Sequence, residues 1–389
     1  MKKGLLALAF GGLSIGMTEF TMMGILPDIA GDIGVNIPVA AHLIALYALG
    51  VFVGAPILVL FTSKYPPKKV LILLMLMFFV FNGLFAIAPN HWSMQLTRFM
   101  SGLPHGAFFG VGSVVAAKMA PKGKEAQYIS IMFTGMTIAN LLGVPLGTFL
   151  GHHYSWRITY GIICFLGLGT ALSIFFWLPN IASSNSENIF SQLSYFKRPE
   201  AWLLIVLISV GTGGLFAWIS YIAPLVTNVS GIAAGKVPFI MILVGLGMCF
   251  GNLLGGKLAD SISPTKAAMI CFSSMAVCLV VVYFTSPIEW TAYPMAFITG
   301  LISFTIGAPI QIMLIRTAEG AETLAAAAGQ ASFNMGNTLG AYLGGIPITL
   351  GFAYNTPVLV GSGMAIMGVM LTYAFYKTIV LKKYKHLTR

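Results

Sequence analysis

The sequence predicts an all-α membrane protein with twelve transmembrane helices, arranged as two pseudo-symmetric six-helix bundles. Composition is the first reason: 58% of the 389 residues are hydrophobic and only 8% are charged. The second reason is a succession of long apolar runs, and the third is a repeat that relates the two halves of the chain. Soluble domains carry about 25% charged residues, so the composition argues against a soluble enzyme, a disordered chain and a nucleic-acid binder.

The apolar runs give the predicted helices in order. Each run is close to the roughly 20 residues that a helix needs to cross a bilayer. Barrel strands are shorter and alternate strictly, whereas a helix satisfies its backbone N–H groups within its own segment. The first run shows no small-residue cleavage site, so it predicts a retained helix and not a signal peptide. The runs lie near residues 5–27, 38–61, 70–88, 93–117, 127–150, 157–178, 201–226, 237–259, 266–286, 290–315, 323–350 and 357–380.

Positive charge is distributed unequally between the two sides of the predicted membrane. If the N-terminus is inside, 18 of the 21 Lys and Arg residues fall in cytoplasmic segments. The outer loops then hold only Arg157 and Lys236, and Arg98 lies within a span. Because cytoplasmic loops collect Lys and Arg, this bias predicts cytoplasmic termini and an even number of spans.

A polar segment near the middle of the chain separates two halves of similar length. The prediction is an N-terminal bundle over 1–180, a cytoplasmic linker over 181–200 and a C-terminal bundle over 201–389. Serine, asparagine and glutamate dominate the linker, as expected of an exposed connection.

The two halves are related by an offset of 197 residues. Eight pairs of glycines superpose at this offset, Gly34 with Gly231 among them, and Asn140 superposes on Asn337. Six helices separate the copies, so both copies have the same orientation in the membrane. Parallel repeats of this kind are typical of secondary transporters, whose substrate site lies between the repeats near the midplane.

Several local motifs lie within the predicted helices or next to their ends. They are Thr18–Phe20 with Gly24–Pro27, Leu96–Arg98 with Gly102, Gly135 to Gly147, Ser155–Arg157 with Tyr160, and Gly256–Asp260. Together they resemble the major facilitator superfamily, most closely its twelve-span drug and sugar efflux branch and, within it, the bacterial arabinose-efflux permeases. The resemblance implies a proton-driven exporter in the bacterial cytoplasmic membrane.

One loop departs from the family pattern. In the family, an Asp between helices two and three helps to latch the outward-facing state. Here Ser63 replaces that Asp, while Pro66 and Pro67 replace a glycine and a basic residue. Asp260 retains the acidic position in the second copy, so the resemblance implies a latch in that copy, whereas Ser63 removes the acidic residue from the first.

Glu19 is the acidic residue clearly inside a span. A carboxylate in lipid is costly and is therefore a functional hypothesis by default. Because burial penalises its charged form, Glu19 can exchange a proton near neutral pH, and we predict that it couples transport to protons. A structural glutamate paired with a polar neighbour is the alternative.

Arg98 is the basic residue within a span. It could bind the substrate, or it could set the proton affinity of Glu19 by electrostatic attraction. The alternative is snorkelling, because Arg98 lies about two turns from His91 and the predicted outer surface. The family motif favours a functional role.

Polar and aromatic side chains within the spans are candidates for a substrate-binding cavity. Amides in lipid need partners and often face a cavity, and aromatic rings stack on sugars or planar drugs. Bonding between helices and simple packing are the alternatives for each residue, and His105 could also relay protons. The candidates are Phe20, Tyr47, His105, Asn140, Trp218, Tyr221, Gln311, Gln330, Asn334 and Asn337.

A second group of candidates concerns conformational change. Small residues let helices approach closely and slide, and proline removes a helix hydrogen bond and permits a bend. This group comprises Gly143, Pro145, Gly147, Asp260, Gly340 and Gly344.

The sequence contains no phosphate-binding loop, nucleophile elbow or metal spacing, so we expect a transporter without cofactor or metal, and not an enzyme. We predict export of a small polar solute, such as arabinose or a related sugar, in exchange for protons by alternating access. The alternatives are a multidrug or nucleoside exporter, a proton-coupled importer and a transport-dead sensor. The expected partners are the solute, protons and the lipid bilayer, with no nucleic acid, and the expected functional state is a monomer.

Overall fold

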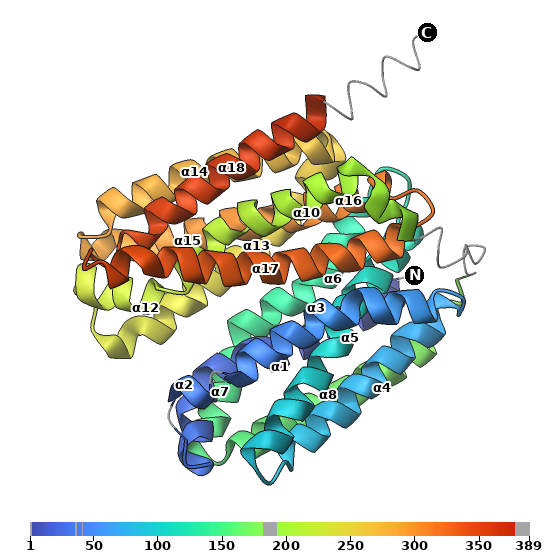
Figure 1. Cartoon of the computed structure of the whole chain (residues 1–389), viewed down its shortest axis with the longest axis horizontal. Coiled ribbons are helices and arrows are strands. Elements are labelled where there is room, and N and C mark those ends of the chain that lie inside the picture. The colour runs from blue at the N-terminus through green and yellow to red at the C-terminus, as the bar shows by residue number, and fades with distance from the viewer. Residues whose placement is uncertain (1, 36, 41, 182–192, 378–389) are drawn as a thin grey trace. The chain divides into compact units, whose positions relative to one another are not determined.

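The chain folds into long helices, in agreement with the predicted class (Figure 1). This computed structural model describes residues 2–35, 37–40, 42–181 and 193–377. Within those ranges all regular structure is helical and no strand occurs. The predicted all-α architecture is confirmed.

The first half contains α1 (Lys2–Asp32), α2 (Ile37–Ala40), α3 (His42–Thr62), α4 (Pro67–Ala86), α5 (His91–Met119), α6 (Glu125–Ile138), the π-helix η1 (Ala139–Gly143), α7 (Val144–His153) and α8 (Trp156–Trp177). The second half contains the short 3-10 helix η2 (Ser194–Lys197), α10 (Pro199–Gly211), α11 (Gly213–Ile219), α12 (Ile222–Pro224), the π-helix η3 (Leu225–Val229), the 3-10 helix η4 (Ala234–Lys236), α13 (Val237–Ser261), α14 (Pro264–Thr285), α15 (Glu289–Thr305), α16 (Gly307–Thr317), α17 (Glu322–Thr349) and α18 (Pro357–Phe375).

Eleven helical segments of the described chain are long and apolar enough to cross a membrane. They coincide with eleven of the twelve apolar runs of the sequence. The remaining run corresponds to α17, which has 28 residues and is rich in alanine, glycine and amides. At 1.5 Å per residue α17 is about 42 Å long, which exceeds the roughly 30 Å hydrocarbon core of a bilayer.

The described chain forms two compact units. Unit 1 comprises Met1–Leu193 with Gly320–Ala331, and unit 2 comprises Ser194–Glu319 with Ser332–Arg389. The predicted boundary segment 181–200 includes residues 182–192, which lie outside the described chain. The start of α17 belongs to unit 1 and the rest of this helix belongs to unit 2. One segment of the second sequence half, Gly320–Ala331, therefore belongs to the unit formed by the first half.

The internal repeat extends to backbone details. Gly123 and Gly320 are equivalent at the offset of 197, and both have φ of +82°. Each backbone N–H donates to a glutamate Oε1 two residues later, Glu125 or Glu322, at 3.1 Å in both cases. Only glycine adopts this left-handed conformation without steric cost. The pseudo-symmetry of the fold is thus present at the level of single turns.

Two predicted spans are interrupted by wider helical turns. In the fifth span, η1 precedes Pro145, and the N–H of Val144 donates to the carbonyl of Ala139. In the seventh span, η3 follows Pro224. Such π-turns occur mostly as single turns within α-helices and frequently mark functional sites.

Close packing of α1 against α6 depends on Gly135. A Cβ at this position would clash with the backbone carbonyl oxygen of Ala9, which cannot rotate away. The two helices touch here without a side chain between them, which is the arrangement that small residues permit in membrane proteins.

Gly135→Ala is therefore expected to destabilise the protein by about 1–3 kcal/mol, the usual cost of overpacking a rigid contact. The measurement is the thermal unfolding midpoint in detergent. Gly169→Ala in α8 is the matched control, because a Cβ there meets nothing within 4 Å. Equal unfolding midpoints for the two variants would contradict the packing argument.

Candidate functional site

Thr18 of α1 is the centre of a buried polar cluster in unit 1. Its hydroxyl donates to Oδ1 of Asn82 in α4 at 2.6 Å and accepts from Nη1 of Arg98 in α5 at 3.1 Å. Its backbone carbonyl accepts from the hydroxyl of Tyr160 in α8 at 3.2 Å. Four helices are thereby joined at one residue of α1, directly before Glu19.

Arg98 is fully buried within this cluster, so it does not snorkel to the surface. Its guanidinium carbon lies 4.3 Å from the ring centroid of Tyr47, 5.5 Å from that of Phe85 and 5.6 Å from that of Tyr160. Its Nε also donates to the carbonyl of Leu43 in α3 at 3.4 Å. Aromatic faces and carbonyl oxygens stabilise a cation without neutralising it.

No described carboxylate forms an ion pair with Arg98; the described ion pairs all lie elsewhere. The positive charge of Arg98 is therefore held by neutral groups in a buried setting. A buried charge of this kind acts on nearby ionisable groups more strongly than a surface charge, because the local dielectric is low.

Glu19 follows Thr18 in α1 and is only partly buried. Its carboxylate forms no hydrogen bond and no ion pair with any residue in the described part of the chain, although it is attracted by the charge of Arg98. A carboxylate within a span that lacks a direct partner is costly to keep charged and remains open to a proton or a ligand.

Tyr47 extends the cluster along α5. Its hydroxyl lies 3.1 Å from Nδ1 of His105, and the two rings are 5.8 Å apart between centroids. His105 is buried and also contacts the ring of Phe109 at 5.3 Å. Arg98, Tyr47 and His105 therefore form a continuous series of contacts inside unit 1.

The remaining substrate candidates occupy several environments. Asn140 lies in η1 and donates to the carbonyl of Met136 at 3.2 Å, four residues earlier in its own helix. Phe20 and Asn337 are partly exposed, whereas Gln311, Gln330 and Asn334 are buried. Gln311 lies in α16, and the other three amides of the second half lie along α17.

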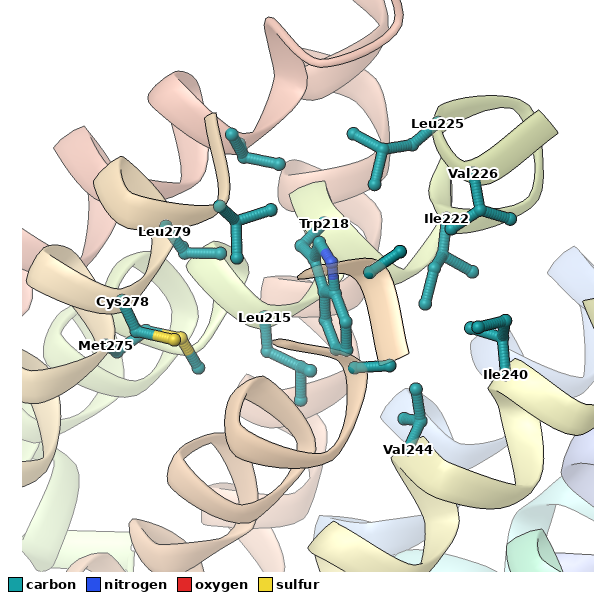
Figure 2. Close-up of a cluster of buried hydrophobic side chains, with 14 of the residues drawn as sticks. Leu215, Trp218, Ile222, Leu225, Val226, Ile240, Val244, Met275, Cys278 and Leu279 are labelled. Carbon is teal, nitrogen blue, oxygen red and sulfur yellow. The ribbon is translucent and has the colours of Figure 1, made fainter. Parts of the chain in front are cut away.

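In unit 2, Trp218 is buried in an apolar cluster (Figure 2). Tyr221 lies three residues later, and its hydroxyl donates to the carbonyl of Ala341 in α17 at 2.7 Å. Both aromatic side chains therefore have packing roles within this unit: Trp218 fills the cluster, and Tyr221 joins the seventh span to α17.

The polar cluster of unit 1 has no polar counterpart at the equivalent positions of unit 2. Gly102 and Gly300 contact the backbone carbonyls of Tyr47 and Val244 in the same way, which sets the correspondence of α5 with α15. Gly102 and Gly300 are 198 residues apart, so α5 aligns with α15 at an offset of 198. Tyr47 and Val244 are 197 residues apart, so α3 aligns with α13 at the offset of 197. The positions of Thr18, Tyr47, Asn82 and Arg98 are then taken by Leu215, Val244, Leu279 and Ala296, which all belong to the apolar cluster of unit 2.

The candidate conformational residues lie at close helix contacts. A Cβ at Gly143 would meet Cγ of Met17 at 2.7 Å, and one at Gly147 would meet Cγ2 of Thr21 at 2.5 Å. In unit 2, Gly340 and Gly344 lie against Gly213 and Ala217 of α11. Pro145 follows η1 in α7, as described above.

The altered loop has a simple local structure. The Ser63 hydroxyl donates to the carbonyl of Leu60 at 2.9 Å, and Pro67 begins α4. In the second copy, Asp260 is partly exposed near the end of α13, and Pro264 begins α14. The loop thus retains a proline helix start in both copies but an acidic side chain only in the second.

A separate network holds the end of α1. Oδ2 of Asp32 accepts from Nε1 of Trp156 at 3.0 Å and from Nη2 of Arg157 at 3.2 Å. Arg157 also donates from Nη1 to the carbonyls of Ala86 and Ala88 at 3.0 and 2.9 Å. The Ser155–Arg157 motif therefore anchors α1 to the end of α4 and lies outside the Thr18 cluster.

Sequence reasoning missed the roles of Thr18, Asn82 and Tyr160. Thr18 and Tyr160 belong to the motifs that resemble the family, but those motifs do not specify the contacts of either residue. Asn82 is a lone amide within an otherwise apolar span, and that isolation was the available signal, because a buried amide in lipid requires partners.

Comparison with known proteins identifies relatives over nearly the whole chain. The model of the Major Facilitator Superfamily matches residues 8–345. "Putative transporter AraJ" of Escherichia coli (strain K12) is 40% identical, covering 97% of this chain and 96% of that protein. "Probable sugar efflux transporter" of Pasteurella multocida (strain Pm70) is 28% identical, with 97% and 92% covered.

Solved structures show the same fold. The E. coli fucose:proton symporter FucP has a TM-score of 0.77 at 13% identity, covering 95% of this chain and 98% of that chain. The proton:xylose symporter XylE has a TM-score of 0.74 at 13% identity, with 96% and 95% covered. At this level of identity the likeness concerns the fold alone.

Proposed function

The chain belongs to the major facilitator superfamily and is a transporter, not an enzyme, and we propose that it exports a small polar solute in exchange for protons by alternating access. The observation that carries the proposal is Glu19, an unpaired carboxylate within a span, placed one residue after the Thr18 cluster. Multi-pass membrane insertion follows from the helices and the family.

Proton coupling is supported by two features of unit 1: a carboxylate without a direct partner, and a buried cation that other groups hold in place. Because Arg98 is held by Thr18, Leu43 and aromatic rings, its charge does not need Glu19 as a ligand. Glu19 can therefore gain or lose a proton, or contact solute, without dismantling the cluster. The charge of Arg98 attracts the Glu19 carboxylate without a direct contact, so a change in the charge of Glu19 changes its interaction with the cluster.

The solute class is supported by the relatives and by the side chains. A relative named as a sugar efflux transporter aligns over most of both chains, which favours a sugar as the solute. Hydroxylated solutes need many hydrogen bonds, and the partly exposed amide of Asn337 in α17 can both donate and accept them. Multidrug and nucleoside export stay as alternatives that a solute screen distinguishes.

We also propose that the protein works as a monomer in the bacterial inner membrane, with both termini in the cytoplasm. The excess of Lys and Arg on one side of the sequence topology supports this orientation. Cysteine accessibility from the two sides of the membrane, measured at Lys69 and Trp290 after substitution, tests it.

The direct test uses purified protein in vesicles of phosphatidylethanolamine and phosphatidylglycerol. A thermal-shift screen of pentoses, hexoses, nucleosides and cationic drugs first identifies the solute. The vesicle interior is then made acidic relative to the bath. A proton antiporter takes labelled solute into the vesicle as protons leave, and a protonophore abolishes the uptake.

The other outcomes are equally clear. Solute that leaves together with protons identifies a symporter and contradicts export by antiport. Binding without flux in either direction identifies a transport-dead sensor. Uptake unaffected by the protonophore contradicts proton coupling.

A further inference from the structure

An open groove of about 470 Å³ runs between α14 and α15 in unit 2. One wall is α14 between Ser273 and Val281, and the other is α15 between Met295 and Ile302. Val277 is 65% exposed in the groove, so the groove opens outward from the unit. A volume of this size is comparable to that of small-molecule pockets.

Along the groove, α14 carries small side chains where its counterpart α4 carries large ones. Pro67 and Pro264 begin the two helices at the same offset of 197. The replacements along the groove, written with the α4 residue first, are Leu76 by Ser273, Met77 by Ser274 and Phe81 by Cys278. Leu84 is likewise replaced by Val281, so four of the five α14 residues that line the groove are smaller than their counterparts in α4.

Groove chemistry favours a hydrocarbon occupant. No charged residue lines the groove. Sγ of Cys278 lies 3.3 Å from Oγ1 of Thr299, and the hydroxyls of Ser273 and Ser274 are the other polar side-chain groups that line the groove. A charged or strongly polar ligand would lose its hydration here without compensation.

The position of the groove along α14 matches one leaflet of a bilayer. Val281 lies about 6 Å and Ser273 about 18 Å from the end of α14 at Thr285, at 1.5 Å per residue. One leaflet contributes about half of a hydrocarbon core roughly 30 Å thick. At the same end, Trp290 is 79% exposed at the start of α15, as expected of a residue at the membrane interface.

We propose that this groove is a binding site for one acyl chain of a bilayer lipid. The headgroup lies at the turn between α14 and α15, and the chain runs from Val281 towards Ser273. Bound hydrocarbon supplies the van der Waals contacts that larger side chains supply in α4. The site is independent of the solute and of proton coupling.

The test uses the full chain in vesicles of phosphatidylethanolamine and phosphatidylglycerol that contain a small fraction of lipid with a photoactivatable diazirine on its acyl chain. Adducts are located by mass spectrometry of peptides. We expect adduct yield on the groove segments to exceed that on other lipid-facing helices by about fivefold, which corresponds to about 1 kcal/mol of preference.

The decisive variants exchange residues between the repeats. Ser273→Leu with Ser274→Met fills the groove with the side chains of α4 and should lower the groove adducts to the level of the other helices. Leu76→Ser with Met77→Ser is the reciprocal change and should create a new adduct site on α4. Ile270→Met on α14, outside the groove, is the matched control and should change neither yield.

Uniform labelling of all exposed helices in the wild type would overturn the proposal, as would groove adducts that persist in the filled variant. Crosslinked dimers in place of lipid adducts would identify a second copy as the occupant and also overturn it. If the filled variant fails to fold, the reciprocal α4 variant still decides the outcome.

Discussion

Glu19→Gln is expected to abolish solute accumulation driven by a proton gradient while exchange of labelled for unlabelled solute continues. Glutamine keeps the size of the side chain and is neutral like the protonated glutamate, but it cannot gain or lose the proton. Because the Glu19 carboxylate has no direct partner among the described residues, the substitution should leave the buried cluster intact. Accumulation should fall to that of vesicles without protein, whereas counterflow should stay near the wild-type rate.

This split between accumulation and counterflow is what identifies a coupling residue. A residue that only binds solute would lose both activities, and a residue that only stabilises the fold would lower the unfolding temperature as well. Glu19→Asp keeps a titratable group and should retain partial accumulation. Glu289→Gln, on the exposed end of α15 near Lys236, is a control for loss of a surface carboxylate. Wild-type accumulation by Glu19→Gln would exclude the proposed role.

Helix positions were predictable because lipid imposes a simple rule: each span must satisfy its own backbone and present apolar side chains. The predicted end of the first helix near Pro27 is too early, because α1 continues to Asp32. Proline opposes helix formation at the preceding turn, but the network at Asp32 fixes the continuation through Trp156 and Arg157. Tertiary contacts of this kind cannot be read from one segment.

The candidate site was only partly predictable for a related reason. A charged residue in a span is visible in sequence, so Glu19 and Arg98 were found. The partners of Arg98 are neutral side chains and backbone carbonyls from five other positions along the chain, and no sequence spacing specifies those contacts. The repeat offered no help, because Leu215, Leu279 and Ala296 occupy the equivalent places in unit 2 with apolar side chains.

Arg98→Lys is expected to lower both the stability of the protein and its proton-driven accumulation of solute, because the guanidinium of Arg98 makes contacts that an ammonium group cannot replace. Lysine keeps the positive charge but has a single ammonium group, whereas Arg98 reaches Leu43 through Nε and Thr18 through Nη1. One of these buried acceptors must lose its donor, which costs about 1–3 kcal/mol. The planar contact with the ring of Tyr47 is lost as well.

We therefore expect Arg98→Lys to lower the thermal unfolding midpoint and to reduce proton-driven accumulation more than counterflow. The two measurements separate two roles of Arg98. If the residue serves only the packing of unit 1, accumulation and counterflow will fall together in proportion to folded protein. If it also tunes Glu19, accumulation will fall further, because the displaced charge attracts the carboxylate less.

Two further variants complete this test. Thr18→Val removes the hydroxyl that joins Arg98 to Asn82 while preserving the side-chain shape, and it should reproduce part of the effect of Arg98→Lys. Arg198→Lys is the matched control, because Arg198 is exposed and its Nη1 donates to the carbonyl of Thr317 at 3.5 Å. An Arg98→Lys protein with wild-type stability and accumulation would show that charge alone suffices at this position, and the geometry of the guanidinium would then have no part in coupling.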